Sequence, residues 1–255
     1  MRFVALRRGE GRKLHIFMLH GQLRDYGGHT YAETVGFIEA FARRGHKLSL
    51  FCTLDAHPDI VAETGARPLY GFDDADLARF PGAGDRSDPA AAELEGFLRT
   101  SQMVLRCCHA MTDLTGAWPD VVTMPWARAW DIEGVADWLA DLPPARRPKV
   151  VLNIIRPEDG WAIDDERREV SGDFSYFRVA SRRVAALAPA GGLALTSVEP
   201  RMCRLIGALS GADCPPAPMQ KHFPDAAQLA ACGSQRDEAA PTVSLMGPMR
   251  WEKGG

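Results

Sequence analysis

Two segments far apart in the chain carry the residue types that bind phosphate groups. Gly27 and Gly28 stand directly before a segment with helical periodicity, and paired glycines let an anion approach a helix N-terminus closely. Arg250 and Lys253 follow a short apolar run, where two cations can flank a diphosphate. We expect these four residues to bind phosphates. For the glycine pair alone, a simple turn is an equal alternative.

A third group of polar side chains follows the apolar run 150–155. Arg156 can clamp an anionic group, and Glu158 or Asp159 can bind sugar hydroxyls. The alternative for any one of them is a solvated loop.

Several other chemistries are excluded by residue order. No Gly-x-Gly-x-x-Gly can be drawn through the loop 21–28, and Lys253-Gly254 reverses the order that a Walker A loop needs. Cys107-Cys108-His109 lacks a second cluster of ligands, so we expect the cysteines to be buried as small hydrophobic residues. We predict neither a metal site nor a cofactor.

Short apolar runs alternate with helical segments, which predicts an α/β fold, a Rossmann-like, mostly parallel sheet with helices on both faces. The first helix has apolar residues at one-face spacing, a capping box from Thr30 to Glu33, and Gly45 as a left-handed cap. The predicted strands are 14–19, 48–53, 121–124, 150–155, 193–196 and 242–246. The predicted helices are the segment after Gly28, 90–111, 132–142, 174–187 and one beginning near Pro200, with an excursion at 71–89.

Composition describes an ordinary globular chain of 255 residues. The formal net charge of -3 shows no basic footprint for nucleic acid. The uncharged stretch from Val184 to Val198 is too short to span a bilayer, and the apolar run at 14–19 is too short for a signal peptide. We predict a cytoplasmic protein without a transmembrane segment. Peripheral membrane contact and the oligomeric state stay open.

The two phosphate-type segments together resemble the retaining glycosyltransferases of the GT-B fold, family-4 type. The matching patterns are Gly27-Gly28-His29 through Gly45-His46-Lys47-Leu48, and Val243-Ser-Leu-Met-Gly247-Pro-Met-Arg250-Trp-Glu-Lys253-Gly254. The family pattern often has a histidine after a middle strand. Thr123-Met124-Pro125-Trp126 stands there instead, so no catalytic residue is assigned.

The resemblance implies an acceptor-side domain at 1–213, a Pro-rich interdomain linker at 214–241, and the first strand and loop of a truncated donor-binding domain at 242–255. Its partners would be a nucleotide-diphosphate sugar and an acceptor hydroxyl, with retention of anomeric configuration and no metal. Gly27, Gly28, Arg250 and Lys253 would bind the donor phosphates. The acceptor-cleft candidates are His29, Arg156 and Glu158.

On this hypothesis the 255-residue chain alone binds a sugar nucleotide poorly and transfers no sugar. Two alternatives stay open: a self-contained Rossmann-like or flavodoxin-like binding module, and another sugar-nucleotide enzyme such as an epimerase. Pairing of Thr242–Met246 with the first sheet would favour the binding module.

Overall fold

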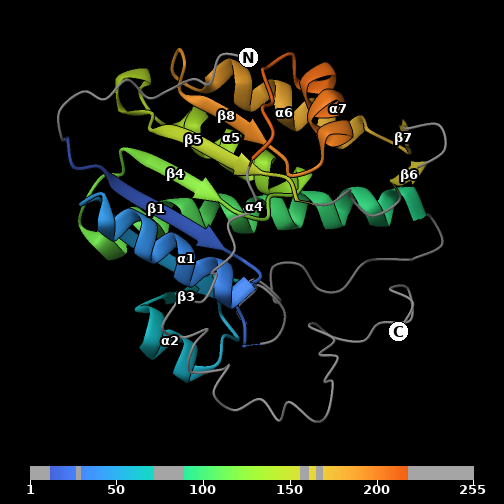
Figure 1. Cartoon of the computed structure of the whole chain (residues 1–255). Coiled ribbons are helices and arrows are strands. Elements are labelled where there is room, and N and C mark those ends of the chain that lie inside the picture. The colour runs from blue at the N-terminus through green and yellow to red at the C-terminus, as the bar shows by residue number, and fades with distance from the viewer. Residues whose placement is uncertain (1–11, 27–29, 72–88, 156–160, 165–168, 218–255) are drawn as a thin grey trace, which may run out of the picture.

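A six-stranded parallel sheet forms the centre of the molecule, in a computed structural model that describes residues 12–26, 30–71, 89–155, 161–164 and 169–217 (Figure 1). The strand order is β3-β2-β1-β4-β5-β8. β8 is the sixth strand of this sheet in chain order, because β6 and β7 belong to a separate hairpin. The order is therefore the 3-2-1-4-5-6 order of the Rossmann fold. The strands are β1 (His15–His20), β2 (Lys47–Thr53), β3 (Arg67–Tyr70), β4 (Val121–Met124), β5 (Lys149–Asn153) and β8 (Leu193–Thr196).

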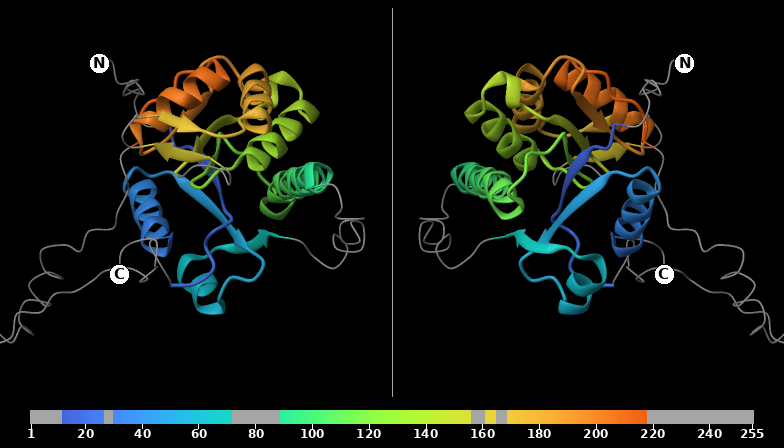
Figure 2. Two further views of the ribbon diagram at one scale, coloured as in Figure 1. Left: turned by 90° about the vertical axis from the view of Figure 1, so that its right-hand side faces the viewer. Right: turned by 90° about the vertical axis from the view of Figure 1, so that its left-hand side faces the viewer.

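Helices cover both faces of the sheet, as the sequence predicts. Helix α1 lies against one face, whereas α4 and α5 lie against the other (Figure 2). The helices are α1 (Thr30–Arg43), α2 (Pro58–Thr64), α4 (Pro89–Thr115), α5 (Ala129–Asp141), α6 (Ser175–Leu187) and α7 (Pro200–Ser210). The remaining elements are a 3-10 turn (Pro144–Arg146) and a small antiparallel hairpin of β6 (Ala162–Asp164) and β7 (Glu169–Ser171).

Strands β1 and β2 are buried on both faces because their side chains alternate between two cores. Phe17 and Leu19 of β1 belong to the larger core, which includes side chains from α4, α5, α6 and α7. Met18, between them, belongs to the smaller core with residues of α1 and α2. This alternation explains why β1 has a continuous apolar run in the sequence.

The predicted C-terminal end of the first helix and the burial of the cysteines agree with the structure. Gly45 has a φ of 70°, which is the left-handed conformation expected after α1. The five cysteines among the described residues are buried and form no disulfide with one another: Cys52, Cys107, Cys108, Cys203 and Cys214.

The sequence prediction missed α2, β3 and the β6–β7 hairpin. Helix α5 also begins three residues earlier than expected, and α4 extends to Thr115. The predicted strand at 242–246 lies outside the described residues, as does most of the predicted linker. At the start of that linker, Ala217 N donates to the Ser197 carbonyl at 2.8 Å, just beyond β8.

Candidate functional site

A cavity of about 190 Å³ lies where the strand order changes direction, at the carboxyl ends of β1 and β4. In a doubly wound sheet the connections from these two strands leave to opposite faces, which opens a crevice at this point. We call it the switch-point crevice. Its lining residues are Leu19, Gly21, Gln22, Tyr70, Met124, Trp126, Arg128, Trp130 and Asp131.

Asp131 forms the polar centre of one wall. Its Oδ1 accepts a hydrogen bond from the Tyr70 hydroxyl at 2.9 Å, and its Oδ2 accepts one from Arg128 N at 2.8 Å. The second bond caps the first turn of α5, so a carboxylate already occupies this helix N-terminus. The arrangement fixes the loop between β4 and α5 and the side chain of Tyr70 together.

Tyr70 closes the side of the crevice next to β1. A Cβ built on Gly21 would lie 2.8 Å from the Tyr70 ring, so only glycine allows this contact. Burial raises the pKa of Tyr70 well above its usual range, the Asp131 carboxylate adds to this rise, and a hydrogen bond with Trp130 opposes it. The hydroxyl therefore stays protonated and acts as a donor at neutral pH.

A second hydrogen bond connects the β4 end with α1. Trp126 Nε1 donates to Glu33 Oε2 at 2.9 Å, and the Glu33 side chain is buried. Burial raises the pKa of Glu33, while the hydrogen bond from Trp126 lowers it. Glu33 thus serves as an acceptor for a residue 93 positions later, a role beyond the predicted capping box.

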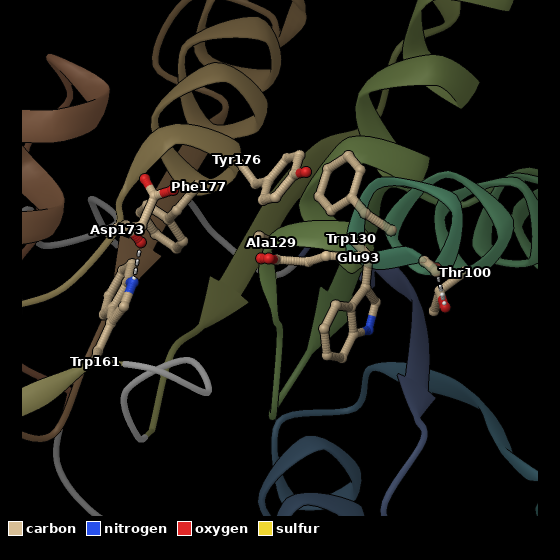
Figure 3. Close-up of a pocket in the computed structure, with 10 residues that line it drawn as sticks. Glu93, Thr100, Ala129, Trp130, Trp161, Asp173, Tyr176 and Phe177 are labelled. Carbon is tan, nitrogen blue, oxygen red and sulfur yellow. Dashed lines mark hydrogen bonds between the residues drawn. The ribbon is translucent and has the colours of Figure 1, made fainter. Parts of the chain in front are cut away.

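A second, larger cavity of about 300 Å³ adjoins the switch-point crevice, because Trp130 lines both. Figure 3 shows side chains from α4, α5 and α6, with Trp161, around this space, which we call the aromatic cavity. Its lining residues are Glu93, Gly96, Phe97, Thr100, Ala129, Trp130, Trp161, Asp173, Tyr176 and Phe177.

The seven residues expected to bind the donor phosphates or to line the acceptor cleft all lie outside the described residues. They are Gly27, Gly28, His29, Arg156, Glu158, Arg250 and Lys253. The structure therefore leaves these seven predictions untested. It does place the carboxyl ends of β1 and β5, which precede five of these residues, at one edge of the sheet with β4 between them.

The sequence prediction missed the residues that line the crevice. Trp126, Arg128, Trp130 and Asp131 follow β4, at the place where the family pattern often has a histidine. The sequence pattern that could have indicated them is a group of aromatic, cationic and acidic side chains just after a strand. Tyr70 offered none, because β3 was not predicted.

Two features of the described part of the chain concern metal binding and membrane-spanning helices. It holds no cluster of three or more His, Cys, Asp or Glu side chains placed to bind a metal ion. Within the same residues, every helix is too short or too polar to cross a membrane.

Fold and site together define a Rossmann-like α/β domain with a crevice at its topological switch point. No family model and no curated protein matches the chain. Among solved structures, the chain is similar to one described as the crystal structure of CalG4, the calicheamicin glycosyltransferase. The identity is 18%, the TM-score is 0.35, and the match covers 79% of this chain. The chain spans 44% of the length of that protein. This distant similarity to a glycosyltransferase supports neither assignment to family 4 nor retention of configuration.

Proposed function

We propose that the chain is the acceptor-side domain of a glycosyltransferase that uses a nucleotide-diphosphate sugar. The observation that carries the proposal is the lining of the switch-point crevice. Two indoles, the amide of Gln22, the guanidinium of Arg128 and the carboxylate of Asp131 meet there. Flat aromatic faces together with planar hydrogen-bonding groups are suited to a polyhydroxylated ligand.

The residues of the sequence resemblance complete the proposal. Gly27, Gly28, Arg250 and Lys253 bind the donor phosphates, and Arg250 and Lys253 stabilise the diphosphate that leaves. His29, Arg156 and Glu158 line the acceptor cleft. The reaction transfers a sugar to an acceptor hydroxyl with retention, in the manner of the family-4 type.

A self-contained binding module is the second candidate, because the strand order is the one that binds dinucleotides. Two features weigh against a dinucleotide. The loop after β1 lacks the Gly-x-Gly-x-x-Gly pattern. In addition, the Tyr70 ring packs on Gly21, where a pyrophosphate would need open backbone.

Ligand-observed NMR on the purified chain tests the proposal. The panel contains methyl glycosides of the common hexoses, two nucleotide-diphosphate sugars, a flavin mononucleotide and a nicotinamide dinucleotide. We expect the glycosides to bind and to bind more weakly to Trp126→Phe, with Trp118→Phe as the control, since Trp118 lies at the opposite edge against Trp138. Tight binding of the flavin or dinucleotide without any glycoside binding would overturn the proposal. Isomerisation of a nucleotide sugar without its cleavage would indicate the epimerase alternative.

A further inference from the structure

The aromatic cavity differs in character from the crevice beside it. Five aromatic side chains surround it: Phe97, Trp130, Trp161, Tyr176 and Phe177. Its two ionisable carboxyl groups are Glu93 and Asp173, and among the described residues that line it there is no Lys, Arg or His. Its volume of about 300 Å³ suits a small ligand or one end of a larger one.

The rings hold one another in place. Phe97 of α4 stacks on Tyr176 of α6, with ring centroids 4.6 Å apart and planes 21° from parallel. Trp161 meets Phe177 edge-on at 5.2 Å, and its Nε1 donates to the Asp173 carbonyl at 2.6 Å. The cavity is therefore bounded by rings that need not reorganise to receive a ligand.

The carboxylates of Glu93 and Asp173 lie near the aromatic rings of the cavity and affect the pKa of Tyr176. Burial raises the pKa of Tyr176, and the carboxylates of Glu93 and Asp173 raise it further. Asp173 Oδ1 accepts a hydrogen bond from Ser175 N at 2.8 Å, which lowers the Asp173 pKa and keeps the carboxylate charged. Glu93 extends from α4 across the opening in Figure 3, between the labelled side chains of Tyr176 and Trp130.

We propose that the aromatic cavity binds an organic ammonium group carried on a small apolar body. The faces of aromatic rings are electronegative and attract cations, and the two carboxylates give the cavity the matching negative charge. Trp130 already makes such a contact within the chain, because Arg128 Cζ lies 5.5 Å from the centroid of its ring. Among the described lining residues there is no cationic side chain that could pair with an anionic ligand.

The position of the cavity suggests how it is used. Trp130 lines both this cavity and the switch-point crevice, so ligands in the two cavities would contact the same indole. If the crevice binds the acceptor of a glycosyl transfer, then the ammonium group lies on the other side of Trp130 from that acceptor. This last step rests on the proposed function, whereas the binding of an ammonium group does not.

Three probes with the same phenyl group and different charges test the proposal by ligand-observed NMR titration of the full chain. They are 2-phenylethylammonium, 2-phenylethanol and 3-phenylpropionate. We expect the ammonium probe to bind about fivefold more tightly than the alcohol, and the carboxylate to bind most weakly. Equal affinity of the alcohol and the ammonium probe, or no binding of the ammonium probe, would overturn the proposal.

Two substitutions on α4 locate the effect. Glu93→Gln should weaken the ammonium probe about threefold and leave the alcohol unchanged, because only a charge is removed from an exposed side chain. Glu95→Gln is the matched control on the same helix turn and should change neither affinity. Equal weakening of both probes by Glu93→Gln would count against a cation site. Glycoside binding in the crevice is measured separately, so either proposal can fail alone.

Discussion

The polar side chains at the amino ends of the strands (the amino edge of the sheet) and those at the carboxyl ends (the carboxyl edge) have opposite roles. At the amino edge, Asp120 Oδ2 accepts from His15 N at 2.9 Å, and its Oδ1 pairs with Arg12 at 2.7 Å. His15 Nε2 lies 2.9 Å from Ser49 Oγ. At the carboxyl edge, polar and aromatic side chains of comparable type line the two cavities. The same residue chemistry thus stabilises the strand ends at one edge and surrounds space for a ligand at the other.

The difference follows from the topology. In a parallel sheet with crossover helices, every helix that follows a strand begins at the carboxyl edge, and the loops there diverge to opposite faces at the switch point. The amino edge receives helix C-termini and tight returns such as the Lys47 N bond to the Leu14 carbonyl at 2.8 Å. Substitutions made at one edge or at the other can test this contrast.

The largest expected effect concerns the helix contact that places α4 beside the carboxyl edge. A Cβ at Gly134 of α5 would lie 2.5 Å from the Ser101 carbonyl and 2.6 Å from Val104 Cβ. Because backbone cannot give way cheaply, Gly134→Ala should lower the free energy of unfolding by about 3 kcal/mol. Urea denaturation measures the change.

The same substitution at Gly96, on the helix packed against α5, is the control. A Cβ there meets nothing within 4 Å. Gly96→Ala should raise the free energy of unfolding by about 0.8 kcal/mol through helix propensity alone. If both substitutions changed the free energy of unfolding in the same direction, the close contact between α4 and α5 at Gly134 would not explain the result.

The next prediction makes one change at each edge. Asp131→Asn replaces an almost fully buried carboxylate that accepts from both Tyr70 and Arg128, so it should cost about 2 kcal/mol in unfolding free energy. Asp120→Asn keeps an oxygen for His15 N and loses only an exposed pair with Arg12, so it should cost about 0.5 kcal/mol. Equal costs would contradict the contrast between the edges.

Two tyrosine–carboxylate hydrogen bonds, one buried and one exposed, allow a comparison with a smaller expected change in stability. Tyr70→Phe removes the donor to Asp131 and should cost about 1.5 kcal/mol. Tyr26→Phe removes an exposed bond to Glu63, which also accepts from Tyr31, and should leave the thermal midpoint unchanged. Only Tyr70→Phe should also alter glycoside binding, since Tyr70 lines the crevice.

The sequence predicted five of the six strands of the sheet and missed β3, one of the two edge strands, for a physical reason. Strands β1 and β4 have a strand on each side, and β8, at the other edge, buries Leu195 in the larger core; the apolar runs of all three match the observed bounds within one residue. Among the described strands, β3 pairs with β2 alone, and its Arg67 and Pro68 are exposed. Because no residue of β3 is fully buried, the strand carries no continuous apolar run.

The sequence predicted where the candidate site lies but not which residues form it. The crossover pattern predicts a crevice at the carboxyl ends of the strands, and Trp126 to Asp131 follow β4 directly. The pairing of Tyr70 with Asp131 joins residues 61 positions apart, and local periodicity contains no information on such a contact. The same holds for Trp126 and Glu33.

The smallest expected effect concerns Glu33, and its sign depends on pH. Burial raises the Glu33 pKa in the folded state above the unfolded value of about 4.3. The protonated carboxyl therefore stabilises the fold below that value, and this contribution is lost as the pH rises through the folded pKa. Glu33→Gln keeps an acceptor for Trp126 without the buried charge. It should raise Tm by about 2 °C at about pH 7.5 and leave it unchanged at about pH 3.5.

Glu39→Gln on the same helix is the matched control, because Glu39 is exposed and pairs with Arg43 in the manner of a surface ion pair. It should shift Tm little at either pH. A lower Tm for Glu33→Gln at about pH 7.5 would mean that the charged hydrogen bond to Trp126 outweighs the desolvation of the carboxylate. In that case the tie between α1 and the β4 end would stabilise the crevice in its ionised form, and ligand binding there should weaken as the pH falls.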